Sequence, residues 1–215
     1  MVHVLLVCGS LQRASANRAA LDVARAALVA SGAQVSAFED LASIPPMNPD
    51  HSDDPGDAVL RWRAHIGAAD AVLIAAPEYA GAIAGVVKNA LDWIVGSGEL
   101  YGKPIALLSA GTSGGVHARR DLVRTLSWQG AHVVASLGIA APKTKSVLDT
   151  DGSHRFTDPT TIQEIGAVAS SLLASVDQEA SERLAAVTRL ALDAGVDPAP
   201  LAQHIAARGA SPAAP

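Results

Sequence analysis

Cysteine, aromatic residues and clustered positive charge are all scarce in this sequence. Its 215 residues include one cysteine, so no internal disulfide can form and we expect a reducing, cytoplasmic location. The net charge is −5 and no basic run occurs, which argues against nucleic acid or an anionic membrane surface as a partner. The chain lacks an apolar stretch of about 18 residues and begins with a strand-like segment, so we expect neither a membrane span nor a signal peptide.

Aliphatic residues supply the core, because only 3% of the chain is aromatic although 49% is hydrophobic. Apolar segments typical of parallel strands buried on both faces occur at residues 2–8, 34–38, 70–76, 104–110 and 131–137. Predicted helices lie between and after them, at residues 17–31, 57–68, 85–94, 116–129 and 160–175. This alternation predicts an α/β fold, a five-stranded parallel sheet with helices on both faces, whose ligands bind beyond the carboxyl ends of the strands.

The segment after residue 175 does not continue this alternation. Residues 176–194 place Leu184, Val187 and Ala191 at helical spacing and predict an additional amphipathic helix. We therefore divide the chain into a ligand-binding domain, residues 1–175, and a C-terminal helical extension with its tail, residues 176–215.

The loop after the first strand has the composition of a phosphate site. Residues 9–17 run from a strand end into a helix start, where unpaired N–H groups carry partial positive charge and can bind a phosphate. Ser10, Ser15 and Asn17 add neutral donors. The loop is neither a Walker A motif nor a Gly-x-Gly-x-x-Gly fingerprint. The alternative is that Ser15 only caps the helix and Ser10 only fills a turn.

Two further loops follow the third and fourth predicted strands. Residues 77–81 (Pro-Glu-Tyr-Ala-Gly) could lie against a planar ring, and the three glycines among residues 111–115 could form an anion-binding nest of N–H groups. Taken alone, residues 77–81 are better explained as an ordinary turn and residues 111–115 as a flexible loop. Because all three loops end at one edge of the sheet, together they indicate one extended ligand with a phosphate and a ring.

Taken in order, these segments resemble the NADPH-dependent FMN reductase family. The resemblance is carried by Gly-Ser-Leu-x3-Ser-x-Asn after the first strand, Pro-Glu-Tyr-x-Gly after the third, and residues 87–93 (Val-Lys-Asn-Ala-Leu-Asp-Trp). Residues 100–104 (Leu-Tyr-Gly-Lys-Pro) and the Gly114–Gly115 turn agree with it. It covers about residues 2–175 and implies a flavodoxin-like fold with strand order 2-1-3-4-5.

The resemblance also implies the cofactor and its contacts. FMN would bind at the strand ends, with NADPH or NADH as co-substrate. The implied cofactor-binding residues are Ser10, Gln12, Arg13, Ser15, Ala16, Asn17, Pro77, Glu78, Tyr79, Ala80, Gly81, Ser109, Gly111, Thr112, Ser113, Gly114 and Gly115. The sequence departs from the family at Gln12, Ala14 and Ala80, where Arg, Gly and Asn are usual.

The function that follows is an FMN-dependent NAD(P)H oxidoreductase. Hydride would pass through FMN to a small acceptor, such as a quinone, an azo compound, chromate or free flavin, in a ping-pong scheme that needs no catalytic side chain. The alternative is a flavodoxin-type electron carrier. No histidines stand at metal-ligand spacing, so we expect no metal site. We also expect a homodimer or homotetramer, because the helix around Trp93 has more apolar surface than one sheet face needs.

Overall fold

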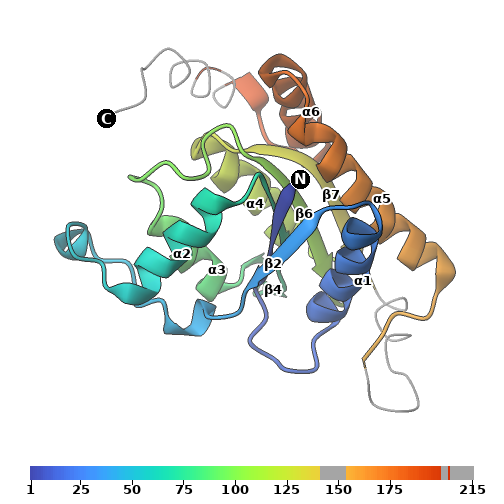
Figure 1. The fold of residues 1–215 in the computed structure, drawn as a ribbon, viewed down its shortest axis with the longest axis horizontal. Helices are drawn as coiled ribbons and strands as arrows, with labels where there is room; N and C mark the ends of the chain where they lie inside the picture. The colour runs from blue at the N-terminus through green and yellow to red at the C-terminus, as the bar shows by residue number, and fades with distance from the viewer. Residues whose placement is uncertain (141–153, 200–202, 204–215) are drawn as a thin grey trace.

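A computed structural model describes residues 1–140, 154–199 and 203 of the chain, and a five-stranded parallel sheet forms its centre (Figure 1). The sheet order is β2-β1-β3-β6-β7 and every neighbouring pair is parallel. The strands are β1 (His3–Cys8), β2 (Gln34–Phe38), β3 (Ala71–Ala75), β6 (Pro104–Ala110) and β7 (His132–Ile139). Counting only these strands, the order is the predicted 2-1-3-4-5, so the flavodoxin-like fold is confirmed.

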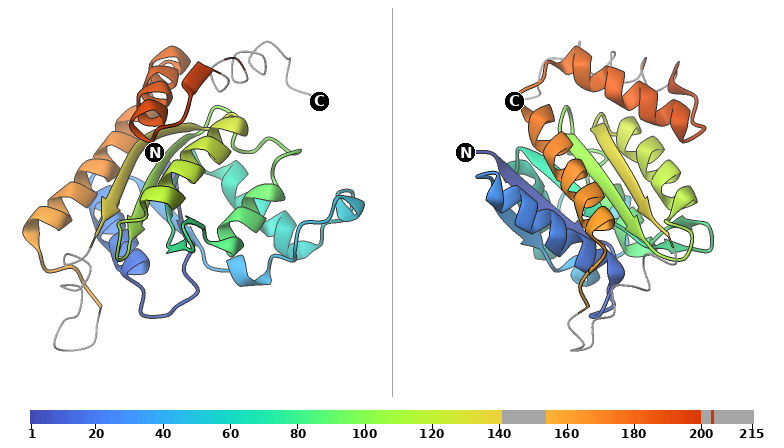
Figure 2. Two further views of the ribbon diagram at one scale, coloured as in Figure 1. Left: turned by 180° about the vertical axis from the view of Figure 1, so that it is seen from behind. Right: turned by 90° about the vertical axis from the view of Figure 1, so that its right-hand side faces the viewer.

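Helices cover both faces of the sheet (Figures 1 and 2). One face packs against α1 (Ala16–Ala30) and α5 (Pro159–Val176). The other face packs against α2 (Asp57–Ala68), α3 (Gly85–Asp92) and α4 (Val116–Trp128). The segment between β2 and α2 contains only two short 3-10 turns, Leu41–Ser43 and Pro49–His51. Within the described ranges, no helix is both long and apolar enough to span a bilayer.

Alternation along each strand separates two hydrophobic cores. In β1, Leu5 and Val7 face the core under α2, α3 and α4, whereas Val4, Leu6 and Cys8 face the core under α1 and α5. Small residues of α1 allow that helix to lie close to the sheet. Cys8 is buried among these apolar side chains, and burial raises the pKa of its thiol.

A two-stranded hairpin, which the sequence analysis describes only as a loop, follows β3. Its strands are β4 (Glu78–Tyr79) and β5 (Ala82–Ile83), which pair antiparallel outside the main sheet. Ala80 and Gly81 form its two-residue turn, and both have positive φ, 52° and 71°. Positive φ at both central positions is characteristic of a type I′ turn, the connection that suits a tight hairpin.

The C-terminal segment is part of the same packed structure. The helix predicted at 176–194 is interrupted, and α6 (Ala180–Asp193) begins after α5 has ended at Val176. α6 packs against β7 and α4, and its Val187 and Ala191 are buried (Figure 2). The division into a ligand-binding domain, residues 1–175, and a C-terminal extension, residues 176–215, remains a proposal. Residues 200–202 and 204–215 of the predicted extension lie outside the described residues.

The apolar face expected to be exposed on the helix at 85–94 is buried within the monomer, so that reason for expecting an oligomer is wrong. Val87, Leu91 and Trp93 are each at most 2% exposed. The segment before α2 covers them: the carbonyl of Pro45 accepts from Asn89 Nδ2 at 2.8 Å and from Trp93 Nε1 at 2.7 Å. Residue composition alone could not show that a segment about 40 positions earlier packs here.

Candidate functional site

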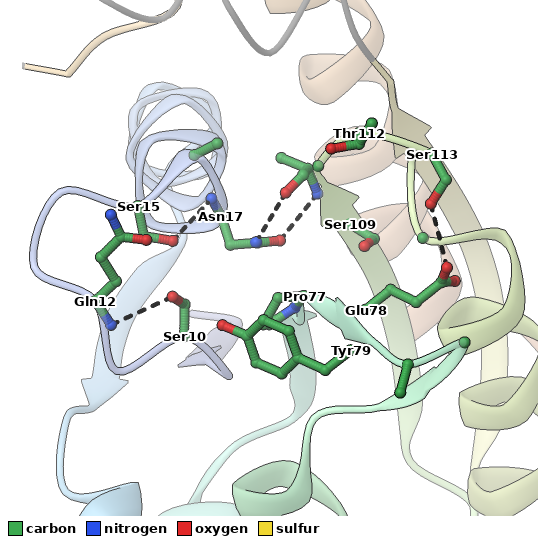
Figure 3. A pocket seen from close by; sticks show the side chains of 16 residues that line it. Ser10, Gln12, Ser15, Asn17, Pro77, Glu78, Tyr79, Ser109, Thr112 and Ser113 are labelled. Carbon is green, nitrogen blue, oxygen red and sulfur yellow. Dashed lines mark hydrogen bonds between the residues drawn. The ribbon is translucent and has the colours of Figure 1, made fainter.

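A cavity of about 440 Å³ opens at the carboxyl ends of β1, β3 and β6, where the three predicted loops meet (Figure 3). It is lined by Ser10, Gln12, Ser15, Ala16, Asn17, Pro77, Glu78, Tyr79, Ala80, Gly81, Ser109, Ala110, Gly111, Thr112, Ser113 and Gly115. Every predicted site residue is in this lining except Arg13, which is exposed elsewhere, and Gly114, which is buried. Ala110 lines the cavity although the sequence analysis did not include it.

The first loop ends at the N-terminus of α1 with two hydroxyl groups in place. Ser15 is the N-cap, and its Oγ accepts from the N–H of Asn17 at 3.2 Å. Ser10 Oγ accepts from the N–H of Gln12 at 3.4 Å. Ser15 therefore does cap the helix, as the alternative interpretation held. Because each hydroxyl acts as an acceptor in these bonds, its own proton remains free to donate to an anion.

The side chain of Asn17 joins the first loop to the end of β6. Its Nδ2 donates to the carbonyl of Ala110 at 3.0 Å, and its Oδ1 accepts from the N–H of Ala110 at 2.9 Å (Figure 3). The side chain is buried, with 3% exposed. The resemblance assigned Asn17 to the phosphate; within the protein the side chain uses one of its two N–H donors and one of its two oxygen lone pairs, so one donor is left for a ligand. Its partner is 93 positions away, so spacing in the sequence could not reveal the contact.

Hairpin β4–β5 forms a second wall of the cavity. Tyr79 is 59% exposed, and its ring lies across the cavity between Pro77 and the first loop (Figure 3). At the tip, Ala80 adopts the left-handed conformation that Asn or Gly adopts more easily. The resemblance leads us to expect asparagine at this position, and the conformation of the turn explains that expectation.

Glu78 connects this hairpin to the third loop. Its Oε2 accepts from the N–H groups of His117 and Ala118 at 2.7 and 3.0 Å, and its Oε1 accepts from Ser113 Oγ at 3.2 Å. Hydrogen bonds from Ala118 and His117 lower the pKa of the carboxyl below its ordinary value, so it is ionised at neutral pH. The sequence predicts residues 77–81 only as contacts of a ring, and this side-chain contact with the third loop and α4 was not predicted.

The third loop is fixed from behind by Ser109. Its Oγ donates to the carbonyl of Ala76 at 2.7 Å, which joins the ends of β3 and β6. Gly115 has a φ of 63°, and a Cβ there would lie 1.9 Å from Ser109 Oγ. Only glycine fits this position. A Cβ at Gly111, in contrast, would meet no atom within 4 Å, because this residue faces open space.

The residues of the cavity fit an FMN molecule. One end offers a helix N-terminus and the hydroxyls of Ser10 and Ser15, a neutral donor set suited to a phosphate. The other end is a space between two loops, of which the third is rich in glycine. The cavity volume of about 440 Å³ falls within the range of cofactor sites. The structure thus describes a flavodoxin-like protein with a cavity suited to a flavin mononucleotide.

Comparison with known proteins identifies the family. The model of the NADPH-dependent FMN reductase family matches residues 2–145. An NAD(P)H-dependent FMN reductase of Pseudomonas aeruginosa is 37% identical over 156 residues, covering 70% of this chain and 83% of the relative. A probable NADPH:quinone oxidoreductase of Oryza sativa is 31% identical, covering 80% of this chain and 88% of the relative. The chain belongs to the NADPH-dependent FMN reductase family.

A solved structure agrees with this assignment at the level of the fold. The flavoenzyme NAD(P)H:(acceptor) oxidoreductase FerB of Paracoccus denitrificans superposes with a TM-score of 0.68 at 24% identity, covering 82% of this chain and 98% of FerB. The predicted class is confirmed: the chain is an FMN-dependent NAD(P)H oxidoreductase. The relatives do not support the alternative of an electron carrier without reductase activity.

Proposed function

We propose that the cavity binds FMN with its phosphate at the N-terminus of α1 and its ring between hairpin β4–β5 and the third loop, and that the acceptor is a planar two-electron acceptor, foremost a quinone. The observation that carries the proposal is the bracing of all three loops into one cavity by Asn17, Glu78 and Ser109. Such preorganisation reduces the entropy cost of binding. Quinone reductases among the relatives support the choice of acceptor.

In this arrangement the chain binds and orients, and the cofactor carries the chemistry. Bound FMN supplies the group that accepts hydride from NAD(P)H and passes it on. Ser10 and Ser15 donate to the phosphate, together with the N–H groups of the first turn of α1. Asn17 fixes the distance between the phosphate end and β6. The main chain of residues 77–81 and 111–115 holds the ring, and the exposed Tyr79 borders the opening where nicotinamide and acceptor enter in turn.

The proposed assembly is a homodimer or homotetramer in the cytoplasm, without nucleic acid or membrane as a partner. Because the cavity opens beside Tyr79, a second copy could cover the ring and restrict the acceptors that enter. Sedimentation of the intact chain tests the assembly, and a strictly monomeric protein at micromolar concentration would contradict it. Truncation before α6 is unsuitable as a test, because α6 contributes Val187 and Ala191 to buried packing.

Titration of the protein with FMN, riboflavin and FAD tests the binding mode. We expect FMN to bind most tightly, because the cavity offers one phosphate site. Ser15→Ala should weaken FMN binding by about 1.5–3 kcal/mol, the range for a hydrogen bond to a charged group. It should also lower stability by about 1 kcal/mol through the lost cap. Riboflavin lacks the phosphate and should bind Ser15→Ala and the wild type equally. An equal loss for both flavins would refute the phosphate assignment.

The reaction is tested with the reconstituted protein under anaerobic conditions. NADPH or NADH should bleach the flavin absorbance, and benzoquinone should restore it faster than an azo dye, chromate or free FMN. Failure of both nucleotides to bleach bound FMN would overturn the function. Faster recovery with the azo dye, chromate or free FMN would leave the enzyme class intact and replace the acceptor.

A further inference from the structure

Helix α4 obtains its N-terminal cap from another part of the chain. Its N-cap residue is Gly115, which has no side chain to offer, and its first turn contains no acidic residue. The carboxylate of Glu78 occupies that place instead, accepting from the N–H groups of His117 and Ala118 at 2.7 and 3.0 Å. Glu78 is 39 positions before His117 and belongs to the opposite wall of the cavity.

We propose that Glu78 is a positioning residue that holds hairpin β4–β5 against the third loop and, by placing a negative charge at the positive end of α4, lowers the reduction potential of the bound flavin. The inference rests on the proposed FMN site and adds a side chain that controls both its shape and its electrostatics. Glu78 needs no direct contact with the flavin for either effect.

The positioning effect follows from three hydrogen bonds. Two come from the first turn of α4, and the third comes from Ser113 Oγ at 3.2 Å, within the third loop itself (Figure 3). The hairpin has only two residues in each strand, so its own ladder is short. The contacts of Glu78 therefore help to fix the separation between the two walls.

The electrostatic effect follows from the charges that surround the cavity rim. The N-terminus of a helix carries roughly half a positive charge. The guanidinium of Arg119 is outside the cavity lining but interacts electrostatically with Glu78, and its Nε donates to the carbonyl of Gly114 at 3.0 Å. Without Glu78 these groups would leave a positive rim, which favours reduced flavin because the reduced form is richer in negative charge. The carboxylate largely cancels that field.

Glu78→Gln separates charge from geometry, since the amide oxygen can still accept from α4. We expect a more positive midpoint potential of bound FMN, with oxidised FMN bound about as tightly as by the wild type. For a two-electron couple, the midpoint potential of bound FMN changes by about 30 mV when the ratio of the dissociation constants of oxidised and reduced FMN changes tenfold. Glu78→Ala should raise the potential too, and should also weaken FMN and riboflavin binding by the same factor.

Two further variants control for nonspecific effects. Asp57→Asn removes a charge from the first turn of α2, which is outside the cavity lining, and should leave the potential unchanged. Ser113→Ala removes one contact of Glu78 but no charge, so it should weaken binding of both flavins without changing the potential. If Glu78→Gln has the wild-type potential or a more negative one, this inference fails while the proposed function stands. If the wild type binds no FMN, both are overturned.

Discussion

Replacement of Ala80 by asparagine is expected to stabilise the protein although it removes no clash and fills no cavity. Ala80 and Gly81 form the tip of hairpin β4–β5, both with positive φ. An L-residue in the left-handed conformation costs roughly 1–2 kcal/mol, because its Cβ approaches the neighbouring carbonyl oxygen. Asparagine tolerates this conformation better than alanine, and Asn-Gly is a preferred pair for a type I′ turn.

The expected magnitude depends on how much of this strain is relieved. Ala80→Asn should raise the free energy of unfolding by about 1 kcal/mol, which corresponds to about 2–4 °C in melting temperature for a chain of this size. Ala80→Gly relieves the same strain, but the unfolded chain gains conformational freedom that offsets about 0.4–1 kcal/mol. The order of stability should therefore be asparagine above glycine, and glycine at or above the wild-type alanine.

Gly81→Ala is the matched test of the same turn. A Cβ at Gly81 would meet no atom within 4 Å, so any loss of stability comes from the backbone conformation alone. We expect a loss of roughly 1–2 kcal/mol. Urea unfolding of the four proteins, monitored by circular dichroism, measures the series. If Ala80→Asn is no more stable than the wild type and Gly81→Ala costs nothing, the turn does not have the left-handed geometry.

Four other substitutions are informative. Gly115→Ala should strongly destabilise the protein in urea unfolding, because its Cβ would overlap Ser109 Oγ, whereas Gly111→Ala should fold normally and change only flavin affinity. Burial lowers the pKa of His132 to about 4, so the contribution of His132 to stability should be constant above about pH 6.5 and should fall between pH 6.5 and 4, by up to about 3 kcal/mol. His132→Gln should remove that part of the slope when unfolding is measured against pH. Gln12→Arg should strengthen FMN binding by about 1 kcal/mol at low salt and less at high salt, without strengthening riboflavin binding; an equal gain for riboflavin would contradict a phosphate contact.

The central strands β1, β3 and β6 were predictable because they are buried on both faces and therefore stand out as nearly continuous apolar runs. Leu5 and Val7 face one core while Leu6 and Cys8 face the other, so every position of β1 is under the same apolar constraint. The site loops were predictable for a related reason, since their Gly, Ser and Pro residues contrast with the strands that precede them. Hairpin β4–β5 was missed because its strands are too short for alternation, and Ala80 replaces the asparagine that marks such turns.

Sequence patterns could not predict the side-chain contacts by which Asn17 and Glu78 hold the loops of the site together. Asn17 lies next to a helix start, where asparagine is a common capping residue, and nothing in its neighbourhood indicates a bond to Ala110. Glu78 likewise lies in a segment predicted as a loop, where a carboxylate is ordinarily expected to be exposed to solvent. Both side chains act across large separations in the chain, which periodicity and local motifs do not report.

The cavity keeps its shape although Gln12 and Ala80 differ from the residues that the resemblance leads us to expect, because neither side chain holds a loop in place. The three loops that form the walls are held in place by Asn17, Glu78 and Ser109, all of which this sequence has. Gln12 is exposed, so exchanging it with arginine changes the charge near the phosphate end but not the position of any wall. Ala80 changes the strain of a turn. Substitutions at such positions can therefore adjust flavin affinity, while loss of a bracing side chain would change the shape of the site itself.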